Sequence, residues 1–118
     1  MVIVKADAAS ELGAMPSEEL LTAMSAYNDE LADAGVLRAA EGLRASSHSA
    51  RVRFSGEERT VVEGPFTPIE EVIAGFWIFN VASKAEAIEW VKRCPNPTRE
   101  DAEIEIRPIF EPEDFEVS

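Results

Sequence analysis

The fold is decided by a run of six residues in the second half of the chain, Phe76-Trp77-Ile78-Phe79-Asn80-Val81. Side chains alternate between the two faces of a β-strand, so Phe76 and Ile78 share one side while Trp77 and Phe79 share the other. Both sides are therefore apolar, which is typical of a central strand covered on two faces. The run predicts a sheet with this strand in its interior and apolar cover on each side.

A helix is predicted upstream of this strand, after residues 8–15, which we interpret as a loop. Ser17 can cap the helix, and the acidic residues that follow it face the positive end of the helix dipole. Gly35 stands in the position that a left-handed C-cap prefers. The apolar stripe between them recurs every three or four residues, at Leu20, Met24, Tyr27, Leu31 and Ala34.

Two further helix starts carry capping-box patterns. Ser83-Lys84-Ala85-Glu86 opens a helix that we expect to run through Arg93. Its predicted buried face consists of Ala87, Ile88, Val91 and Cys94. Thr67-Pro68-Ile69-Glu70 opens a shorter helix of one or two turns, which Gly75 is expected to end.

The other strands are predicted at residues 2–4, 36–37, 50–54, 60–62 and 103–107. In the third of these, Ala50, Val52 and Phe54 alternate with Arg51 and Arg53, the period of a half-buried strand. A turn at residues 55–58 then returns the chain, so the third and fourth strands form a β-hairpin.

The order β–α–β–hairpin–β–α–β predicts an α+β fold, a ferredoxin-like βαββαβ sandwich with an inserted β-hairpin. Right-handed crossovers place both long helices on one face of the sheet. The two-sided strand at residues 76–81 then needs a second cover, and the sequence offers no third long helix. We therefore expect a homodimer in which a second copy of the sheet buries Trp77 or Phe76 and their neighbours.

Composition excludes several classes of function. The 118 residues fit one domain, and 23 acidic against 11 basic residues give a net charge of −12. This charge disfavours direct contact with nucleic acid or anionic lipid. One cysteine (Cys94) and one histidine (His48) exclude an intrachain disulfide and a Cys/His zinc site within one chain. Because the sequence has no membrane span and no signal-peptide pattern, we expect a cytoplasmic protein. We also expect no cofactor and no metal.

Residues 63–71, Glu63-Gly64-Pro65-Phe66-Thr67-Pro68-Ile69-Glu70-Glu71, resemble the D-G-P-F-A-E-T-K-E signature of the YCII-related (YciI-like) proteins, DGPF subgroup. Gly64, Pro65, Phe66 and Glu71 match that signature, and Glu63 replaces its leading Asp. Flanking segments of similar appearance extend the resemblance from about Val2 to Pro108. The corresponding division is a YCII-related domain at residues 1–110 and an acidic C-terminal extension at residues 111–118.

The resemblance implies a ferredoxin-like fold that forms a dimeric α/β barrel, with a pocket between sheet and helices in each protomer. Enzyme-like YciI relatives carry a His on the first helix that is proposed to act with an Asp. The first helix of this chain has no His, so that role is not carried over to His48.

Six residues are candidates for a ligand site: Tyr27, Arg53, Glu63, Phe66, Glu71 and Trp77. Glu63 is the candidate catalytic residue, because a desolvated carboxylate beside a Gly-Pro turn can accept a proton. The structural alternative is that the segment only shapes the turn while Phe66 fills the core. Arg53 can clamp a ligand carboxylate or pair with Glu71. Alternatively both are exposed side chains, which is the favoured interpretation for Glu71. Tyr27 and Trp77 line either a pocket or the core.

Two functions are consistent with these residues. The first is a small-molecule-binding or regulatory module, favoured because acid and base residues do not converge in one motif. The alternative is a cofactor-independent enzyme, isomerase- or monooxygenase-like, that acts on a small cyclic or phenolic compound with Glu63 as base. That alternative rests on analogy of fold.

Overall fold

The computed structural model describes residues 1–98 and 101–115, apart from the side chain of Glu70. Six strands lie at Val2–Lys5 (β1), Leu37–Gly42 (β2), Ala50–Ser55 (β3), Glu58–Glu63 (β4), Ile73–Phe79 (β5) and Ile104–Ile106 (β6). The α-helices are Ala8–Glu11 (α1), Glu18–Asp33 (α2) and Lys84–Lys92 (α3). Short 3₁₀ turns occupy Ser46–His48, Ile69–Glu71 and Pro112–Phe115.

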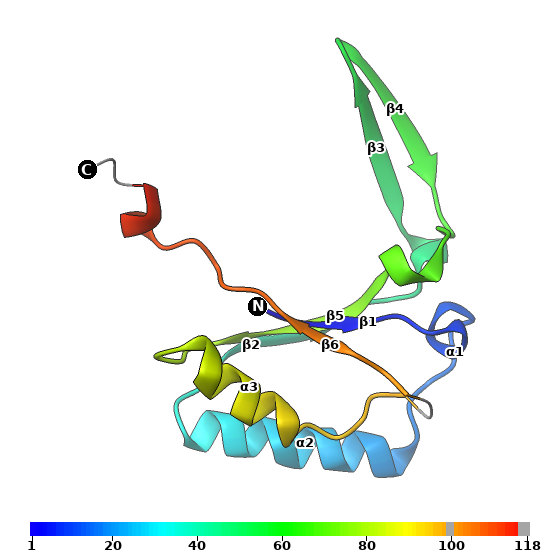
Figure 1. Cartoon of the computed structure of the whole chain (residues 1–118). Coiled ribbons are helices and arrows are strands. Elements are labelled where there is room, and N and C mark those ends of the chain that lie inside the picture. Colours follow the sequence, from blue (N-terminus) through cyan, green and yellow to red (C-terminus); the bar gives the residue numbers. More distant parts are fainter. Residues whose placement is uncertain (99–100, 116–118) are drawn as a thin grey trace.

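Four of the strands form an antiparallel sheet in the order β2-β5-β1-β6. β5 pairs with β1 on one side and β2 on the other, with Val2 opposite Trp77 and Ala40 opposite Trp77 across the two ladders. Both α2 and α3 lie against one face of this sheet (Figure 1). The arrangement is consistent with the predicted ferredoxin-like α+β fold, and β5 is the interior strand that the apolar run indicated.

The local signals of α2 act as predicted. The Ser17 hydroxyl oxygen accepts a hydrogen bond from the Leu20 N–H at 3.1 Å, which satisfies one free donor of the first turn. Gly35 follows the helix with φ of +73°, a conformation that glycine adopts without steric cost. The buried side chains of this helix are Tyr27 and Leu31.

The core lies between the helices and the sheet. Its buried members are Val2, Tyr27, Leu31, Val36 and Trp77. Partly buried residues of α3, Trp90 and Val91, pack against them. Ile88 was expected on this face too, but its side chain is 36% exposed, because α3 turns Ala87 rather than Ile88 toward the sheet.

The opposite face of the sheet, which we call the open face, carries Phe76 and Ile78 of β5. Ile3 of β1 stands opposite Phe76 in the register and is buried, whereas Phe76 and Ile78 are only half-buried. In the described part of the chain, no helix covers this face (Figure 1). Apolar side chains therefore lie on both faces of β5, but only one face has cover from the same chain.

The β3–β4 hairpin rises away from the open face at one end of the sheet (Figure 1). Its two strands pair only with each other, in the register Arg51↔Val62 through Ser55↔Glu58. The expected half-buried strand is wrong in one respect: Val52, Phe54 and Val61 are 54%, 70% and 62% exposed. The period of two is present, but no other described element packs on the apolar side of the hairpin, where the Arg59 guanidinium carbon lies 4.1 Å from the centroid of the Phe54 ring.

Three other local expectations are corrected. Residues 8–15 are not a plain loop, because Asp7 caps α1 through the Ser10 N–H at 2.7 Å. The helix expected from Thr67 is only a 3₁₀ turn at Ile69–Glu71, without a side-chain cap; the capping role assigned to Glu70 falls outside the described side chains. Gly75 does not end that helix but lies inside β5, where an added Cβ would be 2.9 Å from a main-chain oxygen of β2.

Among the described helices, none is both long enough and apolar enough to cross a membrane.

Candidate functional site

The segment Glu63-Gly64-Pro65-Phe66 lies at the base of the hairpin, where it crosses the 3₁₀ turn at Ser46–His48. The Gly64 N–H donates a hydrogen bond to the Ser49 carbonyl oxygen at 2.8 Å. A Cβ atom on Gly64 would lie 1.8 Å from the Ser46 carbonyl oxygen, far inside van der Waals contact. The glycine is therefore required by the close approach of two backbone segments.

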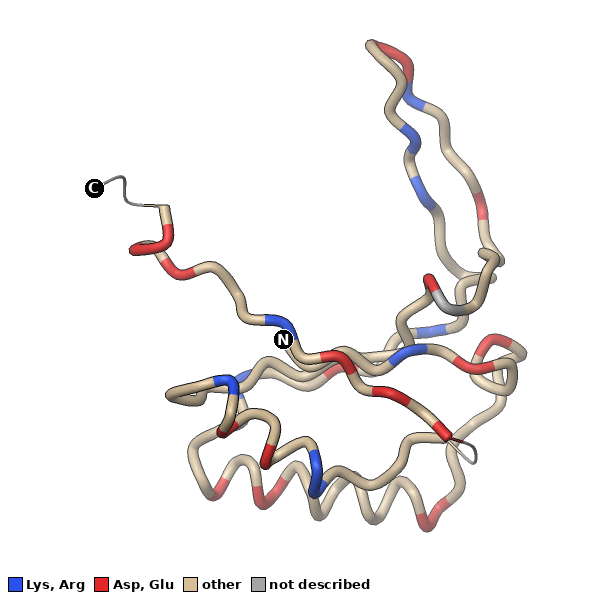
Figure 2. The backbone as a smooth tube through the Cα atoms, viewed as in Figure 1, with Lys and Arg blue, Asp and Glu red and all other residues tan. Residues whose placement is uncertain are grey.

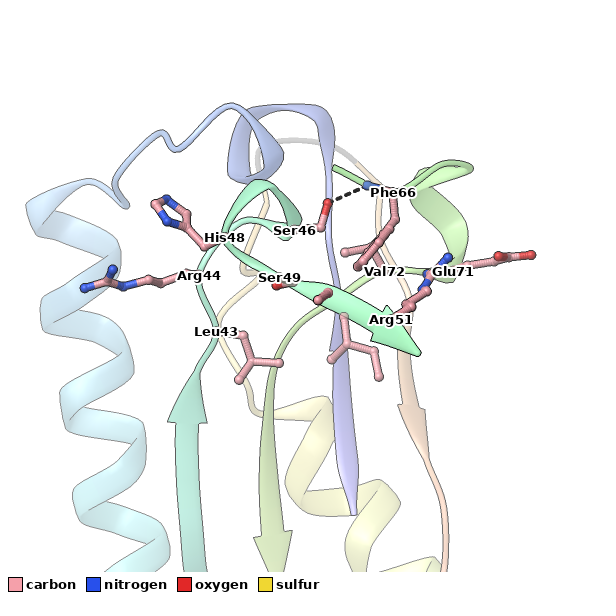
Figure 3. A pocket seen from close by; sticks show the side chains of 11 residues that line it. Leu43, Arg44, Ser46, His48, Ser49, Arg51, Phe66, Glu71 and Val72 are labelled. Carbon is pink, nitrogen blue, oxygen red and sulfur yellow. Dashed lines mark hydrogen bonds between the residues drawn. The ribbon is translucent and has the colours of Figure 1, made fainter. Parts of the chain in front are cut away.

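Ser46 connects three parts of the chain at this crossing. It is 3% exposed, and its N–H donates to Glu11 Oε1 at 2.9 Å. Its hydroxyl donates to Glu11 Oε2 in a short contact and accepts a hydrogen bond from the Phe66 N–H at 2.9 Å. Figure 3 marks the bond between Ser46 and Phe66. The carboxylate at the end of α1 thus anchors the turn that carries the hairpin and, through it, the segment that follows β4.

Beside this network lies an open cavity of about 450 Å³. Its apolar lining consists of Leu43, Ala50, Phe66, Val72 and Ile73. Its polar and charged lining consists of Arg44, Ser46, His48, Ser49, Arg51 and Glu71. The volume is in the range of small-molecule sites, and the mixture of an apolar floor with a few polar groups is typical of them.

The charged side chains stand on two sides of the cavity. Figure 3 shows Arg44 and His48 on one side and Arg51, Phe66 and Glu71 on the other. The guanidinium carbon of Arg51 lies 4.0 Å from the centroid of the Phe66 ring, a cation–π contact that orients the arginine. The Glu71 carboxylate points outward in the same view. In the same view the Arg44 and His48 side chains also point away from the centre of the cavity, so Arg51 is the cationic group held against the apolar lining.

The predicted site residues do not gather in one place. Phe66 and Glu71 line the cavity. Arg53 and Glu63 are exposed on the hairpin, opposite Thr60 and Ala50 respectively, and are not among the lining residues.

Tyr27 and Trp77 lie in the core on the helix side of the sheet. Their rings meet edge to face with centroids 5.8 Å apart. The Tyr27 hydroxyl donates to the Trp90 carbonyl oxygen at 2.7 Å, and Trp77 Nε1–H donates to Asn28 Oδ1 at 2.8 Å. Burial raises the pKa of Tyr27 well above its ordinary value. Both polar atoms are satisfied within the chain, so the two rings act here as packed core residues.

Five polar or charged lining residues were not among the sequence candidates: Arg44, Ser46, His48, Ser49 and Arg51. A signal for them was present in the sequence. Residues 42–56 contain three arginines and the only histidine and no acidic residue, in a chain of net charge −12. His48 is exposed and borders the cavity.

The remaining chemistry-bearing residues lie elsewhere. Burial raises the pKa of the Cys94 thiol to about 11, and its Sγ contacts the Pro95 carbonyl oxygen at 3.2 Å. Glu105 is near Lys5 at 3.8 Å and Arg107 at 3.7 Å. Over residues 1–98 and 101–115, no three His, Cys, Asp or Glu side chains are grouped so that they could hold a metal ion.

Fold and site together define a small α+β domain with an antiparallel sheet, helices on one face and an open cavity at the base of a hairpin. The model of the YCII-related domain matches residues 1–113, and the chain belongs to that family. An uncharacterized protein of Rhizobium meliloti (strain 1021) is 28% identical over 92 residues, which cover 78% of this chain and 74% of the relative.

Proposed function

We propose that this protein is a homodimeric small-molecule-binding module of the YCII-related family, DGPF subgroup, whose ligand occupies the cavity at the base of the hairpin. In the proposed assembly the ferredoxin-like domains, with the hairpin as an insertion, pair through their open faces as a dimeric α/β barrel. The observation that carries the proposal is the apolar surface at the end of the molecule that bears the cavity, which no described helix covers.

The amount of exposed surface supports a second copy. The chain has a radius of gyration of 16.6 Å, whereas a compact domain of this length has about 13.5 Å. Its accessible surface is 8922 Å², roughly 2,600 Å² more than a compact monomer of this size exposes. Permanent dimer interfaces bury about 2,000–5,000 Å² in total, so the excess is large enough to supply one.

The position of the apolar side chains supports the same assembly. On the hairpin, Val52, Phe54 and Val61 share one side, since Val52 is directly opposite Val61 in the register. On the sheet, Phe76 and Ile78 occupy the open face from which the hairpin rises. A second copy placed against both surfaces would bury one continuous apolar area and close the cavity further from water.

Sedimentation equilibrium at micromolar concentration tests the dimer, with two variants in neighbouring positions of β4. Val61→Glu places a charge on the apolar side of the hairpin and is expected to shift the protein to monomer. Thr60→Glu places the same charge on the other side, opposite Arg53, and is expected to leave the dimer intact. A monomeric wild-type protein would contradict the dimer. If the two variants have equal dimer dissociation constants, the hairpin is not part of the dimer interface.

A thermal-shift screen tests ligand binding. A compound present at a hundred times its Kd adds about 2.7 kcal/mol to the folded state, which gives a clear rise in Tm. Ile73→Trp, at a cavity residue that is 42% exposed, is expected to abolish the shift. Ile88→Trp is the control, because Ile88 is 36% exposed on α3 and is not a lining residue. A shift that survives in Ile73→Trp would place the ligand elsewhere, and a screen without any binding compound would count against the proposal.

The enzyme alternative gains no support from the described residues, because Glu63 is exposed and lies outside the cavity. The cytoplasmic location stays a prediction of the sequence.

A further inference from the structure

The cavity at the base of the hairpin differs in charge from the rest of the chain. The protein has a net charge of −12, yet residues 42–56, which form one wall of the cavity and rise into β3, contain three arginines and no acidic residue. Figure 2 shows basic positions at the hairpin base and along its first strand, while acidic positions dominate the helices and the C-terminal part. The described lining holds two arginines against one acidic residue, Glu71, and the neighbouring Glu11 carboxylate already accepts the Ser46 N–H and hydroxyl, so the guanidinium groups can attract an anion.

Within the described side chains, the two arginines at the cavity have no acidic partner. Among the residues that the structure describes, neither Arg44 nor Arg51 has a carboxylate oxygen within 4.0 Å. Arg93, the C-cap residue of α3, in contrast contacts Glu30 at 2.7 Å. Glu71 is the one acidic residue among the described lining, and its side chain points outward (Figure 3). An anion in the cavity would therefore not compete with an internal partner of either guanidinium.

The geometry of Arg51 favours a planar anion. Its guanidinium carbon lies 4.0 Å from the centroid of the Phe66 ring, and no described residue accepts a hydrogen bond from it, so its N–H groups can donate to a ligand. A carboxylate accepts two parallel N–H bonds from the edge of a guanidinium, which is the strongest form of this contact. The adjoining floor of Leu43, Val72 and Ile73 is apolar and suits the apolar body of a ligand.

Resting on the proposed function of this site, we propose that its ligand is a small organic acid with a flat or aliphatic apolar body. The carboxylate binds the Arg51 guanidinium edge, and the apolar part lies on Leu43, Ile73 and the Phe66 ring. Arg44 and His48 lie on the other side of the cavity, with side chains that point away from its centre (Figure 3), and take no part in this contact.

The test is an NMR titration of the ¹⁵N-labelled full chain with two probes of equal shape, benzoate and neutral benzamide. We expect benzoate to shift the amide signals of residues 49–51 and 71–73 and to bind at least tenfold more tightly than benzamide. Arg51→Gln should weaken benzoate binding at least tenfold and change benzamide binding less than twofold. Arg53→Gln, on the same strand and the same side but outside the cavity, should change neither by more than twofold.

The outcomes separate this inference from the proposed function. If benzamide and benzoate shift the same cavity signals with equal Kd, the ligand class is wrong while small-molecule binding stands. If Arg51→Gln binds benzoate as tightly as the wild type, the assignment of Arg51 is wrong. Benzoate shifts confined to other surfaces would overturn the anion site. The ratio of the two probes on wild-type protein keeps the inference testable even if Arg51→Gln does not fold.

Discussion

Replacing Gly64 with alanine tests the close backbone approach at the base of the hairpin. The added Cβ would lie 1.8 Å from the Ser46 carbonyl oxygen, although real Cβ atoms stay beyond 3.0 Å. The two segments must therefore separate by roughly 1.2 Å, the difference between those distances. Overpacking of this kind costs about 1–3 kcal/mol.

The same displacement stretches two hydrogen bonds, Gly64 N–H to the Ser49 carbonyl oxygen and Phe66 N–H to Ser46 Oγ. Each contributes about 0.5–1.5 kcal/mol. We therefore expect Gly64→Ala to lower the free energy of unfolding by about 3 kcal/mol, within a factor of two. Urea unfolding followed by tryptophan fluorescence, at one fixed protein concentration, measures the change.

Gly42→Ala is the matched control. Gly42 lies in β2 with no atom within 4 Å of the added Cβ and with an ordinary φ, so alanine should be neutral or stabilising by up to about 1 kcal/mol. If Gly64→Ala unfolds at the same urea concentration as Gly42→Ala, and the Phe66 amide keeps its protection from hydrogen exchange, the close approach described above is wrong.

Three further changes test the packing around the core and the site. Ser46→Ala removes the acceptor of the Phe66 N–H and should cost about 1–3 kcal/mol in urea unfolding, whereas Ser47→Ala at the exposed neighbour should cost less than about 0.5 kcal/mol; equal effects would contradict the Ser46 network. Tyr27→Phe removes a 2.7 Å hydrogen bond and should cost about 1 kcal/mol at pH 7. Burial raises the pKa of Tyr27, so the folded state holds the phenol proton more tightly than the unfolded state does. The free energy of unfolding of the wild-type protein should therefore fall as the pH rises above about 10. Unfolding curves measured at a series of pH values should show a smaller fall for Tyr27→Phe. The raised pKa of Cys94, about 11, leaves little thiolate near pH 8. Iodoacetamide should therefore modify the thiol of the folded protein at least about 100-fold more slowly than a free cysteine. Alkylation at the rate of the urea-unfolded chain would show that the thiol is not buried.

Much of the fold follows from signals that act over a few residues. Ser17 and Gly35 bound α2 because a hydroxyl cap and a left-handed glycine stabilise helix ends without help from distant residues. The two apolar faces of β5 follow from the period of a strand, so the sheet interior was predictable from residues 76–79.

The errors arise where a distant segment decides the outcome. Gly75 stands where a helix-ending glycine would stand, but its backbone is packed against β2, so an opposing strand sets its role. Alternation at Val52 and Phe54 shows that β3 has an apolar side, yet only the tertiary arrangement shows that this side has no cover from its own chain.

The candidate site was predictable only in part, because distant segments decide which residues line the cavity. Phe66 and Glu71 were found through the Gly-Pro segment, and both line the cavity. Arg51 and Arg53 have the same local pattern and share a side of β3, so alternation cannot separate them. Their positions along β3 distinguish them, because Arg51 lies at the base of the hairpin and lines the cavity, whereas Arg53 lies further along the strand and does not. Ser46 was hidden because its partner Glu11 is 35 residues away and belongs to an unexpected helix.

The ladder of β3 and β4 is independent of the register of the four-stranded sheet. Two residues can therefore be added to or removed from each strand at its Gly56 turn, and every remaining side chain keeps its side, because the repeat of a strand is two. The length of the hairpin can therefore change in steps of about 7 Å while the Glu11–Ser46 hydrogen bonds at its base stay the same. In this architecture, the length of the hairpin and the hydrogen bonds that hold its base can vary independently.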